Sequence, residues 1–561
     1  MTADRRAPAD RPDRPDCPDR PEGPREPQAP PHRSAVTRRA LLGLAGAGAA
    51  LGALPALPAL GGERAPARPT ARSADARPAA SAAASYRAVY HHTVPDEWKN
   101  DPQRPLLVDG AYHYWYLYNA DYRAGAEGTA WRLTTSTDLV TFTDQGIAIP
   151  KDTTPNGDVW SGSAVVDHDD TAGFGAGAVV ALVTMEPVEG AHTQAQYLWY
   201  STDGGRSFVP HGTDPVLANP DVRDFRDPKL LRDAERGRWV QLLAENDKVG
   251  IYVSADLRSW SYVSGFVRDG LGVLECPDLF RIETAEGEAR WVLGVSANGK
   301  PVGLPHTYAY WVGSFDGETF TAETDQPRWL DHGFDWYAAV TWEKHTDLTT
   351  GAVDPTTRYA LGWMNNWDYA HTTPTLEAGG FNGTDSIVRE VTLGRDADGG
   401  WALFSRPVDT LAGRATHTRE LGDLTVDGEL VLDFTGVAYE VTTTVRWEQL
   451  TTLGLQLRRS GDGASHIDAG VHGEYAFLNR GGVPHPDGTG TWLESRTPFD
   501  PARRAATLRV LVDRTTVELF LDDGRYVHSH LAFPAPEATG LALFTVGGPA
   551  TFTGVVIRAF E

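Results

Sequence analysis

Residues 136–142 read Ser136-Thr137-Asp138-Leu139-Val140-Thr141-Phe142, a Ser-x-Asp turn that follows an apolar run and is closed by an aromatic side chain. Similar stretches begin at Ser201, Ser254 and Ser314. The four starts lie roughly 65, 53 and 60 residues apart, too far for single hairpins but right for one four-stranded propeller blade per repeat. A β-turn with an aromatic anchor is common by itself. Four of them at near-constant spacing predict a β-propeller of about five blades.

The sequence around these turns is typical of an all-β protein. Helix signals are scarce after about Tyr86, and short β-rich runs alternate with turns of Gly, Asp, Asn and Pro. We expect strands at residues 112–118, 178–184, 197–200, 239–243, 291–295 and 308–312.

The pattern of strand-like runs in the sequence changes after about Ala412. Runs that read as strands, some of them longer, occur at residues 424–434, 439–447, 454–458 and 508–521, the first interrupted by a turn signal at Asp427-Gly428. We therefore predict a propeller over residues 86–412 followed by a β-sandwich over residues 413–561.

The first 85 residues are predicted to be a leader. Residues 1–36 are dense in Pro, Arg and Asp and should be disordered. Residues 37–42, Thr-Arg-Arg-Ala-Leu-Leu, precede a run of Leu, Ala and Gly that reaches about Leu60, which resembles a twin-arginine export signal. The alternative is a single membrane anchor. We expect a secreted protein without stable membrane association after processing, because no other segment is long and apolar enough to span a bilayer.

Charge and cysteine content narrow the possible partners. The net charge is −24, which disfavours binding to nucleic acid or anionic membranes but does not affect a neutral polysaccharide. Removal of the leader would also remove Cys17 and leave Cys276 as a single thiol, as suits a protein that is exported already folded. No His/Cys/Asp cluster has metal-ligand spacing and no glycine-rich phosphate loop is convincing, so we expect neither a metal nor another cofactor.

Three acidic segments are candidates for catalysis. Asp101 lies in Glu97-Trp98-Lys99-Asn100-Asp101-Pro102-Gln103, Asp227 in Phe225-Arg226-Asp227-Pro228-Lys229, and Glu275 in Glu275-Cys276-Pro277-Asp278. Proline should fix the backbone after each aspartate and favour an extended conformation before it. Hydrolysis of a glycosidic bond with retention needs two carboxyl groups about 5–5.5 Å apart, one to attack and one to transfer the proton.

In this order and spacing, the three segments resemble those of glycoside hydrolase family 32, which includes invertases, inulinases, levanases and fructosyltransferases built from a five-bladed propeller and a β-sandwich. The resemblance implies that Asp101 is the nucleophile, Asp227 the transition-state stabiliser and Glu275 the general acid/base, which must be protonated to release the leaving group. It implies a fructan as substrate. An inverting arabinan hydrolase on the same type of propeller and a sugar-binding module without catalysis remain as alternatives.

Weaker matches suggest the sugar-binding residues and the substrate. The predicted substrate-binding residues are Trp98, Asn100, Gln103, Trp160, Ser161, Arg226, Cys276, Asp335, Trp336 and Tyr337. The chain departs from the usual family pattern at Gln103-Arg104-Pro105 and at Leu117, where a glutamine is frequent. The Asp-Pro-Gln-Arg-Pro form at residues 101–105, together with residues 160–163 and 335–342, resembles the levan-active branch, so hydrolysis of levan is favoured. Intramolecular transfer that releases a difructose anhydride, as in levan fructotransferases, is the alternative.

Overall fold

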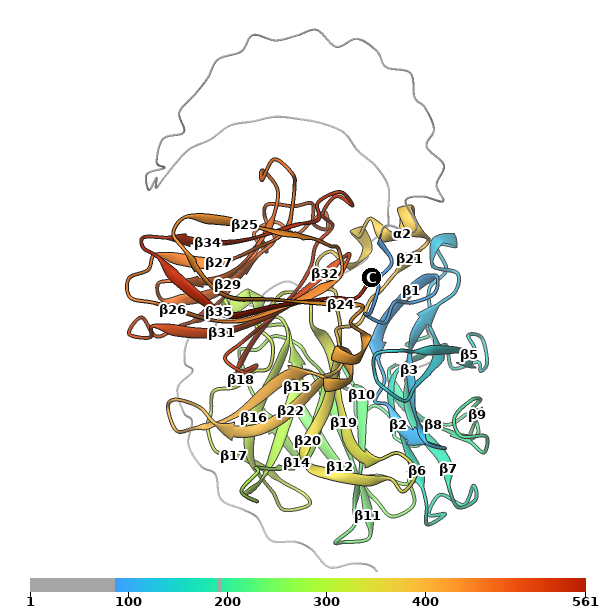
Figure 1. Ribbon diagram of the computed structural model, residues 1–561. Helices are drawn as coiled ribbons and strands as arrows, with labels where there is room; N and C mark the ends of the chain where they lie inside the picture. Colours follow the sequence, from blue (N-terminus) through green and yellow to red (C-terminus); the bar gives the residue numbers. More distant parts are fainter. Residues whose placement is uncertain (1–85, 189–192) are drawn as a thin grey trace, which may run out of the picture. The chain divides into compact units, whose positions relative to one another are not determined.

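The computed structural model describes residues 86–188 and 193–561, so the predicted leader and its export signal lie outside the described residues. The described residues are organised mainly as strands in seven sheets (Figure 1). Five of these sheets come before residue 410 and two after it.

The first five sheets are antiparallel propeller blades, and each begins with its innermost strand. The strands of blades 1 to 3 are β1 (Glu97–Pro102), β2 (Leu106–Val108), β3 (Ala111–Asn119), β4 (Ala130–Ser136) and β5 (Thr143–Ile149); β6 (Val159–Asp167), β7 (Ala178–Met185), β8 (Ala195–Ser201) and β9 (Val209–Pro210); and β10 (Arg226–Asp233), β11 (Arg238–Glu245), β12 (Lys248–Ser254) and β13 (Ser261–Val267). Those of blades 4 and 5 are β14 (Leu274–Glu283), β15 (Ala289–Ala297), β16 (Tyr308–Phe315), β17 (Phe320–Ala322) and β18 (Arg328–Trp329); and β19 (Tyr337–Asp347), β20 (Ala352–Trp363), β22 (Arg389–Arg395) and β23 (Trp401–Pro407). Short helical turns η1 (Tyr122–Ala124), η2 (Lys300–Val302), η3 (Ala370–Thr372) and α2 (Thr375–Gly379) lie in the connections.

The middle strands of the blades are apolar on both faces. Every residue of β7 is buried, and β3 carries the aromatic run Tyr112-His113-Tyr114-Trp115-Tyr116. Blades stack face to face, so a middle strand meets protein on both sides and has no polar alternation. Separate apolar clusters fill the spaces between neighbouring blades.

The four Ser-x-Asp turns occupy equivalent positions, as the repeat predicted. Each lies at the end of the third strand of blades 1 to 4 and leads into the outermost strand. In the first, the Asp138 carboxylate accepts hydrogen bonds from the backbone N–H groups of Val140 and Thr141. The prediction of a five-bladed propeller is thereby confirmed.

The ring is closed by a parallel pairing. Strand β1 pairs on one side with β3 of its own blade and on the other with β21 (Phe381–Asn382), with Glu97 opposite Phe381 and Trp98 opposite Asn382. Segment β21 belongs to the connection between the second and third strands of blade 5.

The remaining two sheets form a β-sandwich. After η4 (Asp409–Arg414), one sheet has the order β24 (His417–Val426), β35 (Ala550–Ala559), β26 (Tyr439–Trp447), β31 (Ala505–Val512), β32 (Thr516–Leu521) and β33 (Tyr526–Leu531). The other has the order β25 (Glu429–Thr435), β34 (Gly540–Val546), β27 (Thr452–Arg459), β28 (Ile467–His472), β29 (Tyr475–Asn479) and β30 (Glu494–Pro498). One apolar cluster with contributions from both sheets forms its core.

Buried charged groups join the propeller and the sandwich. His91 precedes the first blade, and its ring lies between two sandwich carboxylates, 3.0 Å from Asp513 Oδ2 and 2.9 Å from Glu518 Oε1. Burial lowers the pKa of His91, but the two carboxylates outweigh burial and raise it to about 9. His91 is therefore a charged structural contact.

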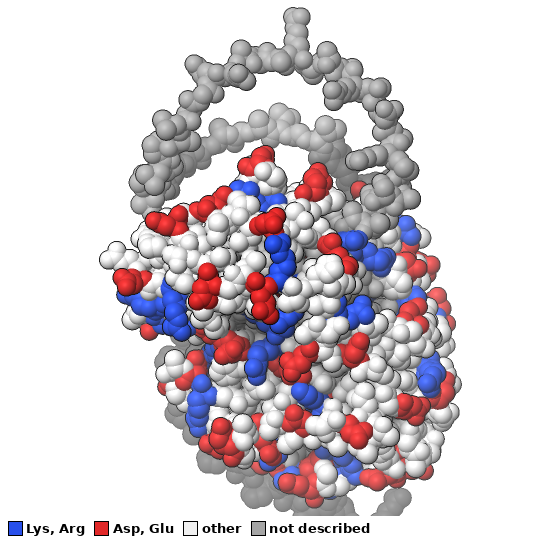
Figure 2. All heavy atoms as spheres, viewed as in Figure 1, with Lys and Arg blue, Asp and Glu red and all other residues white. Residues whose placement is uncertain are grey.

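The surface is mixed in charge. On the face shown in Figure 2, acidic side chains are spread over the molecule and interspersed with Lys and Arg. Among the helices of the described residues, none combines the length and the apolar character needed to cross a membrane.

Candidate active site

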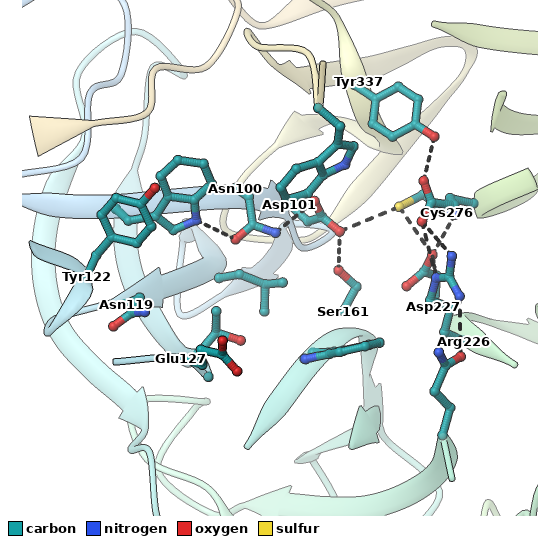
Figure 3. A pocket seen from close by; sticks show the side chains of 18 of the residues that line it. Asn100, Asp101, Asn119, Tyr122, Glu127, Ser161, Arg226, Asp227, Cys276 and Tyr337 are labelled. Carbon is teal, nitrogen blue, oxygen red and sulfur yellow. Dashed lines mark hydrogen bonds and ion pairs between the residues drawn. The ribbon is translucent and has the colours of Figure 1, made fainter. Parts of the chain in front are cut away.

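A cavity of about 560 Å³ opens at the start of the innermost strands and brings together the three predicted catalytic acids (Figure 3). It is lined by Trp98, Asn100, Asp101, Leu117, Asn119, Tyr122, Ala126, Glu127, Gly128, Thr129, Trp160, Ser161, Gln194, Asp224, Arg226, Asp227, Glu275, Cys276, Tyr337, Trp367 and His371.

All five innermost strands break register where they reach this cavity. The breaks fall between Lys99 and Pro102, Val159 and Gly162, Arg226 and Lys229, Glu275 and Asp278, and Tyr337 and Val340. Such bulges re-aim side chains, and a proline fits them because it needs no ladder partner for an N–H. The extended backbone expected before proline is wrong for Asp227, whose φ is 61°, and Cys276, which precedes Pro277, also has a positive φ of 48°.

Asp101 is held as an acceptor of hydrogen bonds. Ser161 Oγ donates to its Oδ2 at 2.6 Å, and Asn100 Nδ2 donates to its Oδ1 at 3.1 Å. Burial raises the pKa of Asp101 to about 6, Ser161 and Asn100 oppose this, and the nearby Glu275 adds to it. Asp101 is thus ionised above about pH 6, as an attacking carboxylate must be.

Asp227 lies close to Asp101 and next to an arginine. Its carboxylate, that of Asp101 and the Cys276 sulfur have atoms within 4.8 Å of one another. The backbone N–H of Cys276 donates to Asp227 Oδ2 at 3.1 Å, and Arg226 Nε is 3.9 Å from the same oxygen. Burial raises the pKa of Asp227 to about 7, with Arg226 opposing and the two other carboxyls adding.

The Cys276 thiol stays neutral in this setting. Burial, together with the adjacent carboxylates, raises its pKa well above the usual value. A protonated thiol is a poor nucleophile and a poor metal ligand, so Cys276 fills space beside Asp101 and Asp227.

Glu275 is held at both carboxyl oxygens. Arg226 donates from Nη2 to Oε1 at 2.8 Å, and the Tyr337 hydroxyl donates to Oε2 at 2.5 Å. Burial and the neighbouring Glu275 raise the pKa of Tyr337 well above its usual value, so Tyr337 remains a donor. This arrangement fixes the orientation of the group that must transfer a proton.

Two sequence-family models together match nearly all of the described residues. The N-terminal domain of glycosyl hydrolases family 32 matches residues 91–407, and the C-terminal domain of the same family matches residues 408–559. The chain belongs to glycosyl hydrolase family 32. It is a glycoside hydrolase, and the predicted family and enzyme class are confirmed.

Individual relatives agree with this family. Levanbiose-producing levanases of Bacillus subtilis (strain 168) and Geobacillus stearothermophilus are each 48% identical to the chain. The matches cover 85% of this chain and 91% of the first relative, and 71% of this chain and 100% of the second. The crystal structure of exo-inulinase from Aspergillus awamori has a TM-score of 0.74 at 26% identity and covers 84% of this chain and 97% of that chain.

Most of the residues predicted from the family 32 motifs line the cavity, but three do not. Gln103 lies behind it, where Nε2 donates to the Asp101 carbonyl and Oε1 accepts from the Gly162 N–H at 2.7 Å. Asp335 and Trp336, also predicted to bind the sugar, are fully buried and lie outside the lining. Asp335 pairs with Arg480 of the sandwich at 2.7 Å, and Trp336 Nε1 donates to Ser386. Only Tyr337 of that segment, the first residue of β19, reaches the cavity; Asp335 and Trp336 precede the strand.

Several cavity residues of this family 32 enzyme were not predicted from the sequence. Asn119 is the last residue of β3, and the others come from connections: Tyr122, Ala126, Glu127, Gly128, Thr129, Gln194, Asp224, Trp367 and His371. The aromatic and Asn-Asn run at Trp363–Trp367 could have indicated Trp367, which is 40% exposed at the cavity. The others lie in short polar stretches that resemble ordinary turns.

Proposed function

We propose that this family 32 enzyme hydrolyses levan outside the cell, with retention of configuration, and releases levanbiose. The observation that carries the proposal is that Asp101, Asp227 and Glu275 line one cavity and lie in the motifs of a fructan-cleaving family. The two levanases at 48% identity carry levanbiose production in their names, which supports levan as substrate and levanbiose as product.

The side chains provide each step of a double displacement. Asp101 attacks the anomeric C2 of the bound fructosyl unit and forms an ester bond as the C2–O bond to the leaving sugar breaks. Glu275 transfers its proton to the departing oxygen, which leaves as a hydroxyl. Glu275 then takes a proton from water, whose oxygen attacks C2 and releases Asp101. Asp227 binds fructosyl hydroxyls, and Arg226 orients the carboxyl groups of Asp227 and Glu275.

Product analysis on levan tests the substrate and the outcome together. We expect levanbiose as the main chromatographic product and slower release from inulin. A difructose anhydride would instead establish intramolecular transfer, and failure to release any product from levan, inulin or sucrose would favour a binding protein. An NMR time course of the anomeric configuration tests the mechanism, because net inversion would remove the nucleophilic role from Asp101.

Export has a test of its own. A reporter protein fused behind residues 1–85 should appear in the culture medium of a host with the twin-arginine pathway. Arg38→Lys together with Arg39→Lys should retain it inside the cell. Unchanged export of the double variant would contradict the predicted route.

A further inference from the structure

The cavity extends well beyond the catalytic acids. Figure 3 shows Arg226 and Tyr337, the two partners of Glu275, on one side of Asp101, and Tyr122, Asn119 and Glu127 on the other. All of these residues, Asp101 included, line the same 560 Å³ cavity. We call the part beside Leu117, Asn119, Tyr122, Glu127 and His371 the distal arm.

The position of the general acid Glu275 decides which part of the substrate the distal arm can hold. Glu275 protonates the leaving sugar, so that sugar must lie on the Glu275 side of the bound fructosyl unit. The sugar unit that precedes the bound unit in the polysaccharide must therefore extend away from it in another direction. In levan the preceding unit is attached through O6 of the bound unit. Figure 3 shows the distal-arm residues Asn119, Tyr122 and Glu127 on the side away from Arg226 and Tyr337, the partners of Glu275. Leu117, which also lines the cavity, has an apolar side chain that makes no hydrogen bond to sugar.

We propose, resting on the levanase function above, that the distal arm binds the second fructosyl unit of the chain end, with Glu127 holding its hydroxyl groups and the Tyr122–His371 pair closing its far end. Levanbiose is then the product because two units, and no third, fit between the closed end and the scissile bond.

Glu127 is available for this role. Among the residues that the structure describes, it has no hydrogen-bond or ion-pair partner, so its carboxylate is free to accept from sugar hydroxyls. The segment that carries it is fixed. Asn119 Nδ2 donates to the Ala126 carbonyl at 2.8 Å, and its Oδ1 accepts from the Asp121 N–H at 3.0 Å. Gly128 has a φ of 81° and is so close to Asp158 that a Cβ would lie 2.1 Å from its Oδ2.

The residues proposed to close the arm form a layer of aromatic rings. Tyr122 and His371 each stack on Trp98, at centroid distances of 4.7 and 4.9 Å and interplanar angles of 20° and 16°. The Tyr122 hydroxyl and His371 Nδ1 are 2.6 Å apart, so a hydrogen bond joins blade 1 to the connection after β20 across the arm. Trp98 in turn donates to Asn100 Oδ1 at 3.1 Å, which links this layer to the residue beside Asp101.

Glu127→Ala tests the polar contact. We expect the ratio of kcat/KM on a four-unit levan oligosaccharide to kcat/KM on sucrose to fall about ten-fold or more, because a charge-assisted hydrogen bond to the second unit is lost. Glu235→Ala is the matched control: its side chain is 90% exposed in the turn at the other end of β10, and it should leave the ratio unchanged. An unchanged ratio in Glu127→Ala would overturn the role of Glu127.

Tyr122→Ala and Tyr122→Phe test the closed end. Tyr122→Ala should add products of three or more units, because the ring that ends the arm is gone. Tyr122→Phe keeps the ring and loses only the bond to His371, so levanbiose should remain the main product. Thermal unfolding of both variants checks that they fold, and levanbiose as the sole product of folded Tyr122→Ala would overturn the closing role.

The wild-type products separate the inference from the function on which it rests. Release of fructose alone from levan would overturn the second-unit site and leave fructan hydrolysis standing. No cleavage of levan would overturn the proposed function itself. Levanbiose from wild type, with the ratio and product lengths unchanged in the Glu127 and Tyr122 variants, would overturn the distal arm alone.

Discussion

The hydroxyl of Ser161 donates a hydrogen bond to Asp101 Oδ2 over 2.6 Å and thereby connects the innermost strands of blades 1 and 2 at the reacting carboxylate. The bond favours the ionised form of Asp101, against burial, which raises its pKa to about 6. The acidic limit of activity should therefore depend on this hydroxyl.

Ser161→Ala should move the acidic limb of the kcat/KM profile to higher pH. The attacking group is active when ionised, so activity is present above the pKa of Asp101 and lost as the pH falls through it. Loss of the donor raises that pKa further. Initial rates on levan across the acidic and neutral range measure the shift. Ser163→Ala, on the same strand but bonded to the Leu230 N–H, is the control, and coincident profiles for Ser161→Ala and wild type would refute the assignment.

Asp101→Ala and Glu275→Ala should each lower kcat by at least about 10³-fold, because each removes a chemical role. Both residues line a cavity rather than the core, so circular dichroism and thermal unfolding should show a folded protein. Azide, an attacking anion that needs no general base, should give a fructosyl azide of retained configuration with Glu275→Ala, by attack on the Asp101 ester, and one of inverted configuration with Asp101→Ala, by direct attack on C2. Near-wild-type turnover in either variant would contradict the assignment.

Arg480→Met should destabilise the protein by about 3–5 kcal/mol, since it leaves the buried Asp335 carboxylate without its cation. The Asp335 carboxylate also accepts from the Leu531 N–H at 2.7 Å, so it cannot turn away to solvent. Urea unfolding measures the loss. The double variant with Asp335→Asn should recover part of it, and equal losses in the single and double variants would show that the charge is not the cause.

His91 should make stability depend on pH. Its pKa lies near 9 in the folded protein against 6.5 ordinarily, so its contribution is fully present below about pH 6.5 and is lost as the pH rises through about 9. The free energy of unfolding should fall over that interval, as followed by denaturant titrations at a series of pH values. His91→Gln should be less stable at neutral pH and show a flatter dependence; a parallel curve would exclude His91 as the source.

The sequence was enough to predict the propeller and the three acids, for a physical reason. The Ser-x-Asp turns recur once per blade because each blade needs the same reversal after its third strand. Asp101, Asp227 and Glu275 belong to compact motifs because the register breaks that aim them are made by the neighbouring residues.

The rest of the site depends on distances along the chain that a local pattern does not show. The Tyr122–His371 bond joins residues of different blades, and nothing near either residue indicates its partner. Asp335 resembles a sugar ligand until its partner Arg480 is known, which comes from the other domain. The positive φ of Asp227 likewise arises from the bulge and not from the following proline.

The pairing of β1 with β21 also sets an order of events during biosynthesis. Glu97 and Trp98 leave the ribosome early, whereas Phe381 and Asn382 leave it only when almost the whole propeller has been translated. Until then the nascent chain exposes a free strand edge beside the nucleophile, open to wrong partners. Catalytic competence should therefore be acquired only after residue 381 has been translated, and a polypeptide truncated before residue 381 should lack activity.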